Sequence, residues 1–463
     1  MRLAIVIMAA GKGTRLKSKR AKVLHEIGGK PLLRHVIASA SQIVSPSDIY
    51  VVVGHQAGTV EAAVKDTGVR FVHQEEQRGT GHAVQTAADS VRDYDQLLVL
   101  SGDVPLLKPE TISALRDFHI EQQAAMTILT AAPADPTGYG RVLRKSQGAP
   151  EVKAIVEQKA LTPAQQKERE INSGIYGFRT EPLFANISKL KTENAHGEYY
   201  LTDMAGLLVE EGERVVALEA TNPVEVLGAN TIAEMMELDR ELRLDTARRL
   251  MAQGVIILRP ETTVIDSSVE VGPDTVIEPF VQLLGETKIG EDCRIRSYSV
   301  VENSTVGNNV LIQQACVIAD ALIEDIASIG PFTHLRPKAH IGEGAHVGNF
   351  VELKKTKLGK GVKANHLAYL GDAEIGGGTN VGAGTIICNY DGVLKHPTLI
   401  GEKVFVGSNS TIVAPVEIGN GAYIAAGSAI TESVPDNALA IGRSRQVNKP
   451  EWAAQKRAKS TKS

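Results

Sequence analysis

The chain has 463 residues, more than one hydrophobic core usually holds, so two or three domains are expected. Hydrophobic residues make up 43% of it and charged residues 22%, proportions typical of a water-soluble globular protein. A formal net charge of −4 gives no overall reason to expect a nucleic acid or a membrane surface as partner, and no apolar run is long enough to span a membrane.

The first apolar run and the cysteines both bear on the cellular compartment. Residues 3–10 could form the core of a signal peptide, but the run is short and passes directly into Gly11, so we interpret it as a strand. Cys293, Cys316 and Cys388 are odd in number and lack the spacing of metal ligands, which favours reduced thiols. We therefore expect a cytoplasmic protein.

Up to about residue 230, short β-branched runs alternate with helical stretches, which predicts βα units on a mostly parallel sheet. The expected strands are Leu3–Met8, Ile49–Val53, Val69–His73, Gln96–Leu100 and Met126–Thr130. Ligands of such sheets bind at the carboxyl ends of the strands, so the residues that follow each run are the first candidates for a site.

A glycine-rich turn, GKGTR at residues 11–15, follows the first expected strand. Its glycines allow backbone N–H groups to approach a phosphate closely. It lacks the Gly-Lys-Ser/Thr ending of a Walker A loop, and Leu16 stands where a dinucleotide-binding turn needs a third glycine, so both classes are excluded. Arg15 and Lys22 beside it suit a triphosphate. A plain strand-to-helix turn with solvated lysines is the alternative.

A carboxylate follows another buried strand, because LLVLSGDVPLL leads from apolar residues directly to Asp103. A carboxylate at the carboxyl end of a strand, opposite a phosphate-binding turn, is suited to a Mg²⁺ ion that bridges phosphates. Taken alone, Asp103 fits a turn or capping residue equally well. The turn and the carboxylate together favour the metal.

The stretch TIAEMMELDRELRLDTARRLMAQG predicts a helix over residues 231–253 that connects the two halves of the chain. Thr231, with Glu234 three residues later, is typical of a capping box, and Gly254 is a natural stop after the last helical residue.

From Ile265 onward an aliphatic residue recurs at about every sixth position, often followed by glycine. Such a hexapeptide repeat is typical of a parallel β-helix, whose turns bury their aliphatic residues against each other. Equivalent positions recur at intervals of 17 or 18 residues, which predicts three short strands in each turn. These positions are Val306, Ile323, Ile341, Leu358 and Ile375.

The repeat is interrupted between Ile387 and Ile400, where CNYDGVLKHPTL is expected to form a projecting loop. The last segment of the chain is expected to cap the open end of the β-helix. The basic tail KRAKSTKS, residues 456–463, is expected to be disordered.

Seven short motifs occur in a characteristic order: MAAGKGTR, KVLH, QRGTGHA, SGDVPLL, GYGRV, IVEQKA and INSGIYGF. They resemble those of the sugar-1-phosphate nucleotidyltransferases. With the hexapeptide half, nearly the whole chain is similar to the bacterial bifunctional N-acetylglucosamine-1-phosphate uridyltransferases and glucosamine-1-phosphate N-acetyltransferases. The resemblance implies an α/β protein with a Rossmann-like, mostly parallel nucleotidyltransferase domain (1–230), a linker helix (231–253), and a left-handed parallel β-helix with its tail (254–463).

The resemblance also implies roles in the first half. Arg15 and Lys22 are the implied catalytic cations, and Asp103 and Asn230 the implied ligands of Mg²⁺. The implied residues for UTP or the UDP-sugar are Gly11, Lys22, Gln74, Gly79, Thr80, Gly140, Glu157, Asn172 and Asn230. Because the sugar phosphate itself attacks the α-phosphorus, positioning and charge neutralisation carry the catalysis. One position departs from the family, in which proline commonly stands in place of Ala21.

Polar residues that break the hexapeptide pattern decide whether the second half has its own chemistry. Arg336 and Lys354 suit a sugar phosphate. His366 taken alone is typical of a surface residue, but with these cations and the looped-out Asn389-Tyr390 near it in the repeat order we interpret it as functional.

By resemblance, His366 is the general base that takes a proton from the amino group of glucosamine 1-phosphate as this group attacks acetyl-CoA. The residues implied to bind the amino sugar phosphate are Arg336, Lys354, Tyr369, Asn380 and Lys395. Those implied to bind acetyl-CoA are Ala383, Asn389, Tyr390, Ser408, Ala426 and Arg443. Cys388 as an acyl-carrying nucleophile is less favoured, because direct transfer needs no covalent step.

The resulting hypothesis is a two-step enzyme that acetylates glucosamine 1-phosphate and then couples the product to UTP, with Mg²⁺ as cofactor. The family forms trimers of side-by-side β-helices, which implies a homotrimer, and its product feeds cell-envelope synthesis. Nucleic acids and membrane insertion are not expected. Two alternatives remain: a nucleotidyltransferase whose β-helix serves only for assembly, and a non-catalytic subunit that binds a sugar nucleotide and regulates a partner.

Overall fold

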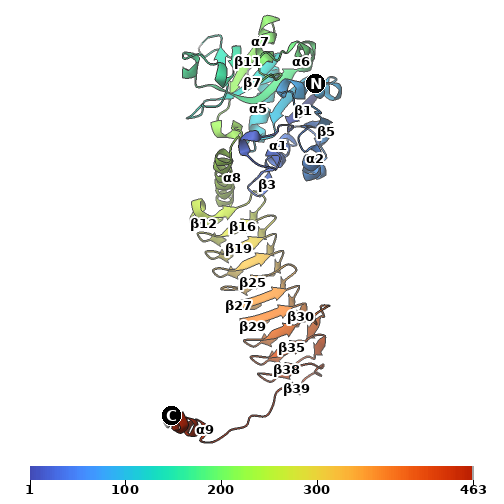
Figure 1. Cartoon of the computed structure of the whole chain (residues 1–463), viewed down its shortest axis with the longest axis vertical. Helices are drawn as coiled ribbons and strands as arrows, with labels where there is room; N and C mark the ends of the chain where they lie inside the picture. The colour runs from blue at the N-terminus through green and yellow to red at the C-terminus, as the bar shows by residue number, and fades with distance from the viewer. Residues whose placement is uncertain (147, 195, 461–463) are drawn as a thin grey trace. The chain divides into compact units, whose positions relative to one another are not determined.

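A computed structural model describes residues 1–146, 148–194 and 196–460. The chain divides into two compact units, Met1–Leu242 and Arg243–Ser463 (Figure 1). The boundaries at residues 230 and 253 stay predictions. Among the described residues, no helix combines the length and the hydrophobicity that crossing a membrane requires.

The first unit is built on a mostly parallel sheet with the strand order β11-β7-β10-β6-β1-β4-β5, extended by the hairpin β8-β9. Its strands are β1 (Leu3–Met8), β4 (Ile49–Val53), β5 (Arg70–His73), β6 (Gln96–Ser101), β7 (Met126–Ala131), β8 (Arg141–Arg144), β9 (Val152–Val156), β10 (Ile171–Arg179) and β11 (Val215–Glu219). All five expected strands are confirmed. Strand β10 was not expected, and it pairs antiparallel with both β6 and β7.

Helices cover both faces of this sheet. Neighbouring residues on β1 point to opposite faces, so Val6 packs in one apolar cluster and Ile5 in another. Strands that are buried on both faces read as continuous apolar runs, which is why β1 looks like the core of a signal peptide in the sequence. The helices are α1 (Leu32–Ala40), α2 (Ala57–Val64), α3 (Thr80–Thr86), α4 (Ala88–Val91), α5 (Pro109–Glu121), α6 (Thr180–Asn186) and α7 (Asp203–Glu210).

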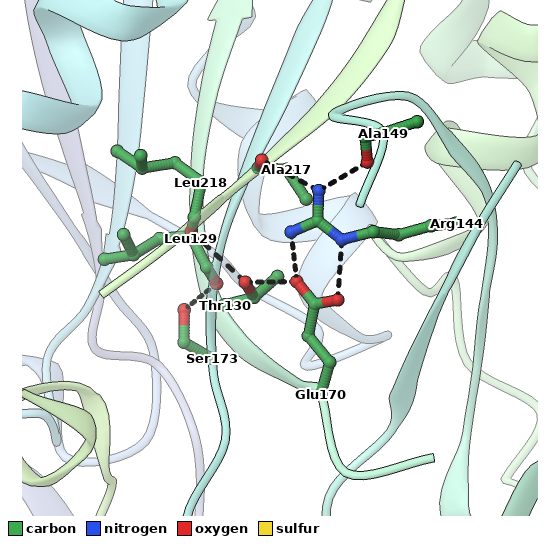
Figure 2. A network of polar contacts seen from close by, with 8 residues as sticks. All are labelled: Leu129, Thr130, Arg144, Ala149, Glu170, Ser173, Ala217 and Leu218. Atoms are coloured by element: carbon green, nitrogen blue, oxygen red, sulfur yellow. Dashed lines mark hydrogen bonds and ion pairs between the residues drawn. The ribbon is translucent and has the colours of Figure 1, made fainter. Parts of the chain in front are cut away.

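An ion pair attaches the β8-β9 hairpin to the central sheet (Figure 2). Arg144, at the end of β8, donates from Nε to Glu170 Oε2 at 2.7 Å and from a terminal nitrogen to the carbonyl of Ala149 at 2.8 Å. Thr130 of β7 donates its hydroxyl to Glu170 Oε1 at 2.6 Å. Both charged side chains are about four-fifths buried, with 19% and 18% exposed. The pair therefore holds the hairpin in place beside β7 and β10.

We expect Glu170→Gln to lower the free energy of unfolding of the first unit by about 1–3 kcal/mol, because it leaves the Arg144 guanidinium partly buried without a counter-charge. Urea denaturation followed by far-ultraviolet circular dichroism measures the change. Glu168→Gln, at an exposed position two residues earlier, is the matched control. Equal shifts in both variants would show that the Arg144–Glu170 pair contributes nothing.

Helix α8 (Ile232–Ala252) starts with the predicted capping residues. Thr231 Oγ1 accepts from the Glu234 backbone N–H at 3.2 Å, and Glu234 Oε2 accepts from the backbone N–H of Asn230 at 2.7 Å. In a usual capping box this carboxylate would accept from the backbone N–H of Thr231, but here it accepts from the residue before it. This contact orients Asn230. After the helix, Gly254 adopts a left-handed φ of +95°.

The second unit is a parallel β-helix, whose strands form the successive rungs visible in Figure 1. It runs from β12 (Ile256–Ile257) to β39 (Leu439–Ala440), mostly in strands of two or three residues. The predicted register is confirmed, because Val306 pairs with Ile323 and Ile341 with Leu358, all buried inside the prism. Two strands of each turn lie in a 19-stranded sheet and the third in a nine-stranded sheet.

Two turns of the β-helix differ from the others. Strands β27 (His346–Lys354) and β29 (Lys363–Gly371) have nine residues each and pair along most of their length. Beyond them, Ile375 of β30 (Ala373–Ile375) pairs with Ile400 of β33 (Thr398–Ile400), 25 residues later instead of 17 or 18. The extra residues form the predicted loop, in which Tyr390 and Lys395 pair across a short antiparallel bridge.

The prediction for the C-terminal tail is wrong where the structure describes it. Residues 456–460 belong to helix α9 (Trp452–Ser460), because alanine, glutamine, lysine and arginine are good helix formers. Residues 461–463 lie outside the described residues. The expected cap is also wrong, since all described residues from Ile441 onward are exposed and α9 buries no side chain.

Candidate active sites

A cleft of about 490 Å³ lies at the carboxyl ends of β1 and β6 in the first unit. Residues 11–14 of the GKGTR turn line it, and the turn continues into the short helical turn Thr14–Leu16. Gly13 adopts a left-handed φ of +59°, and a Cβ atom there would lie 2.6 Å from the Cβ atom of Lys22. A glycine is required at this position because the stem of Lys22 crosses directly over the turn.

Two cations and two oxygen-bearing side chains meet at this cleft, and two of them, Lys22 and Asp103, line it. Lys22 Nζ forms an ion pair with Asp103 Oδ2 and donates to Asn230 Oδ1 at 3.0 Å. A terminal nitrogen of Arg15 donates to the same Asn230 oxygen at 2.7 Å. The structure therefore brings together the implied catalytic cations and the implied metal ligands.

The oxygen atoms of Asp103 and Asn230 fit a magnesium site. Mg²⁺ prefers oxygen ligands and usually takes only one or two carboxylates, with waters and substrate phosphates completing its shell. The two oxygens already share one cation, the Lys22 ammonium, which places them close enough for a common ion. No group of three or more His, Cys, Asp or Glu side chains positioned to hold a metal occurs within the described ranges.

Gln74, Gly79 and Thr80 also line this cleft and lie close together. Gln74, only 3% exposed, donates from Nε2 to the Gly79 carbonyl at 3.2 Å. Gly79 has a φ of +109°, and a Cβ atom there would lie 2.5 Å from the Tyr199 carbonyl, so no other residue fits. Thr80 Oγ1 accepts from the Leu201 backbone at 3.0 Å. This part of the cleft is thus rigid and rich in hydrogen-bonding groups.

The remaining implied nucleotide-sugar residues line or flank a second cleft of about 270 Å³, which shares Met8, Thr80, Ser101 and Glu198 with the first. Glu157 lines it and accepts from the Thr202 hydroxyl at 3.2 Å, and burial raises the pKa of Glu157. Asn172 donates from Nδ2 to Tyr176 Oη at 2.9 Å and from its backbone N–H to the Gly140 carbonyl at 2.9 Å. The two clefts form one continuous site.

In the β-helix, three cations gather where the long strands end. Arg336 and Lys354 occupy equivalent positions on successive turns, directly after the paired Leu335 and Leu353. Contact with Lys395, from the projecting loop, lowers the pKa of Lys354, and Arg336 adds to this effect. Glu352 accepts from Arg336 at 2.8 Å. A bound anion such as a phosphate would stabilise the charged form of Lys354 against these neighbouring cations.

Tyr369 and Asn389 lie next to these cations. A Cβ atom at Gly371 would lie 2.6 Å from Tyr369 Oη and 2.7 Å from Asn389 Nδ2, so glycine leaves room for both side chains. Asn389 Nδ2 donates to Asp372, and Asp372 raises the pKa of Lys354, opposing the effect of Lys395. The implied sugar-phosphate residues other than Asn380 therefore form one cluster.

His366 and four of the implied acetyl-CoA residues, Ala383, Ser408, Ala426 and Arg443, lie along a different corner of the prism. His366 is exposed, and the pairing of Lys363 with Asn380 puts it in register with Ala383 on the next turn. Asn409 donates its backbone N–H to the Ala383 carbonyl, and Gly427 donates to that of Ser408. Ala383, Ser408 and Ala426 thus continue the same row, and the Arg443 side chain passes beside Gly427.

Asn380 lies away from the other residues that are implied to bind the sugar phosphate. Tyr390 likewise lies away from the row of residues that are implied to bind acetyl-CoA. Asn380 pairs with Lys363 at the start of its strand, away from the three cations. Tyr390 is 58% exposed, and its hydroxyl donates within the projecting loop to the Gly392 carbonyl at 2.5 Å.

Sequence reasoning missed several residues that line or support the sites. Gln77 and Glu198 line the first cleft, Thr202 holds Glu157, and Asp372 holds Asn389. The aromatic and acidic run GEYYLTD, residues 197–203, was a usable signal for part of this set. Asp372 carried no such signal, because it resembles a turn residue of the repeat.

A larger groove of about 680 Å³ lies over the nine-stranded sheet of the β-helix. Its lining includes Glu374, Leu399 and Glu417, and none of the residues implied by the sequence belongs to it. Volume alone therefore does not identify the chemistry of the second unit.

Comparisons with known proteins agree with both halves of this picture. Residues 5–254 match a family model described as a MobA-like NTP transferase domain, and residues 268–303 and 397–432 match the bacterial transferase hexapeptide repeat. The chain is 60% identical over 462 residues to the "Bifunctional protein GlmU" of Koribacter versatilis, covering 100% of this chain and 98% of the relative. It is 51% identical to the protein of the same name from Solibacter usitatus, covering 98% and 97%. The chain belongs to the family of bifunctional GlmU proteins.

Proposed function

We propose that the two units carry two consecutive steps of one synthesis. The β-helix acetylates glucosamine 1-phosphate with acetyl-CoA, and the first unit transfers UMP from UTP to the resulting N-acetylglucosamine 1-phosphate, which gives UDP-N-acetylglucosamine and pyrophosphate. The observation that carries this proposal is a separate cluster of cations in each unit, on a chain similar over its full length to proteins named bifunctional. We assign uridyl transfer to residues 1–230, the linker to 231–253 and acetyl transfer to 254–463.

In the uridyl transfer, a phosphate oxygen of the sugar forms a bond to the α-phosphorus of UTP, and the bond to the pyrophosphate oxygen breaks. Gln74, Gly79 and Thr80 hold the base, while Glu157 and Asn172 hold the sugar. A Mg²⁺ ion held by Asp103 and Asn230 supplies neutralisation of phosphate charge. Arg15 and Lys22 stabilise the charge that develops on the leaving pyrophosphate, in a cleft that orients both substrates.

In the acetyl transfer, the amino nitrogen of glucosamine 1-phosphate attacks the thioester carbon of acetyl-CoA. His366 accepts the proton that this nitrogen loses, the carbon–sulfur bond breaks, and coenzyme A leaves and takes up a proton. Arg336, Lys354 and Lys395 hold the sugar phosphate. The row Ala383, Ser408 and Ala426, with Arg443 beside it, presents acetyl-CoA along the same corner as His366.

The two proposed reactions follow one another. The product of the β-helix is the substrate of the first unit, so one chain performs both steps. We place this activity in the cytoplasm, with small-molecule substrates and no nucleic acid, and we infer that the sugar nucleotide supplies cell-envelope synthesis.

The proposed homotrimer is supported by an apolar stripe along one corner of the β-helix. One residue per turn projects there in a left-handed conformation, including Phe280, Tyr298, Phe332, Phe350 and Leu367. Their exposed fractions range from 48% to 63%, and Phe332 and Phe350 stack with ring centroids 5.3 Å apart. Leu367 follows His366 directly, so subunits that pack on this stripe bring a neighbour to the acetyl-transfer corner.

Phe350→Glu is expected to convert the trimer into monomers at micromolar concentration, because it places a charge in the centre of the apolar stripe. Sedimentation velocity measures the assembly. Leu322→Glu, which changes an exposed apolar residue on the other sheet, is expected to remain trimeric. A wild-type protein that sediments as a monomer at this concentration contradicts the trimer.

The proposed function is tested by two product measurements on one preparation. Free coenzyme A thiol must appear from acetyl-CoA only when glucosamine 1-phosphate is present. Pyrophosphate must appear from UTP only when N-acetylglucosamine 1-phosphate and Mg²⁺ are present. If pyrophosphate forms without any thiol release, the β-helix is an assembly scaffold, and if neither product forms, the chain is a non-catalytic subunit.

A further inference from the structure

Lys22 occupies the position of a cation between the two proposed metal ligands. Its ammonium contacts Asp103 Oδ2 and lies 3.0 Å from Asn230 Oδ1. These are the side chains that would hold Mg²⁺, and the side chains of Lys22 and Asp103 are only 14% and 22% exposed. In the protein without nucleotide, the Lys22 ammonium therefore already occupies both proposed metal ligands and neutralises the charge of Asp103.

The hydrogen bonds leave little capacity for a further cation. An amide oxygen has two lone pairs, and Asn230 Oδ1 accepts from both Lys22 and Arg15, the latter at 2.7 Å. A metal ion that binds this oxygen must displace at least one of them. The charges of Lys22 and Arg15 both lie directly at Asn230 Oδ1, so a free divalent cation that approaches this oxygen meets like charge at short range.

A nucleoside triphosphate reverses this balance. Its phosphate oxygens are strong acceptors for an ammonium group and carry several negative charges. Lys22 lies across the GKGTR turn, whose glycines are expected to let backbone N–H groups approach those phosphates, so its ammonium can exchange Asp103 for phosphate with its stem still lying over Gly13.

We propose that Lys22 is a placeholder cation, which keeps free divalent metal out of the Asp103–Asn230 site and releases this site only when a triphosphate draws its ammonium away. The metal consequently enters together with the nucleotide. This inference rests on the proposed metal site, and it gives Lys22 a second role before substrate binding, as a positioning residue that sets the order of binding.

The test is equilibrium binding of Mn²⁺ without nucleotide, measured by the electron paramagnetic resonance signal of the free ion. Lys22→Met keeps an unbranched side chain that is only one atom shorter and removes its charge, and we expect it to bind Mn²⁺ at least about tenfold more tightly than the wild type. Lys12→Met is the matched control, because Lys12 lines the same cleft. Removal of this charge should change the affinity by less than about threefold.

Adding Asp103→Asn to Lys22→Met separates this inference from the metal site on which it rests. Loss of the tighter binding in the double variant supports both. If Lys22→Met binds no more tightly than Lys12→Met, Lys22 is not a placeholder and the inference fails alone. If tight binding survives Asp103→Asn, the metal lies elsewhere and the proposed metal site itself fails. Circular dichroism checks folding, and Lys22→Gln replaces Lys22→Met, with the same expected tightening, should the latter not fold.

Discussion

His366→Ala is expected to reduce release of coenzyme A thiol by about 10²- to 10⁴-fold, the contribution typical of a general base. The exposed imidazole lies in register with the row that is proposed to present acetyl-CoA, and no other histidine of the described residues lies on this row. A thiol-reactive dye follows the reaction with and without glucosamine 1-phosphate. The pyrophosphate yield of the same preparation should not change, because the substitution lies in the other unit.

His340→Ala is the control for this variant. His340 lies in β26 (His340–Ile341) of the nine-stranded sheet, where it pairs with Glu324 at 2.6 Å. It belongs to the same repeat but to another face of the prism, so thiol release should remain close to that of the wild type. If His366→Ala retains full activity, another group accepts the amine proton, and the corner row does not form the acetyl-transfer site.

Asp103→Asn is expected to reduce pyrophosphate formation by about a thousandfold, since a metal ion at a phosphoryl oxygen contributes several kcal/mol to transition-state stabilisation. The substitution keeps the shape of the side chain and removes the charge. It also leaves the Lys22 ammonium without its carboxylate. A coupled pyrophosphate assay at saturating UTP measures the loss, and raising Mg²⁺ should restore only a small part of it.

Thiol release in the same preparation is the internal control for Asp103→Asn. It should stay at the wild-type level, because the proposed acetyl-transfer residues all lie in the other unit. If pyrophosphate formation survives the substitution, the metal is held elsewhere in the cleft, and the arrangement of Asp103 and Asn230 is structural.

The local pattern of the sequence determined where the repeating elements lie. Strand β1 matches the expected Leu3–Met8, because a strand buried on both faces must be apolar at every position. The step from Ile323 to Ile341 is likewise visible in the sequence, since each turn of a β-helix repeats the same burial pattern. Such features depend on short stretches of chain, which periodicity describes well.

Only the tertiary structure decided which distant residues share a site. Lys22, Asp103 and Asn230 come from separate parts of the chain, and their contact depends on the packing of the whole sheet. The antiparallel insertion of β10 between β6 and β7 was equally hidden, because strand pairing between distant segments leaves no local signature. The projecting loop changes the step of the β-helix to 25 residues and brings Lys395 to Lys354. Sequence periodicity thus located the elements, and long-range packing and charge placed their side chains together.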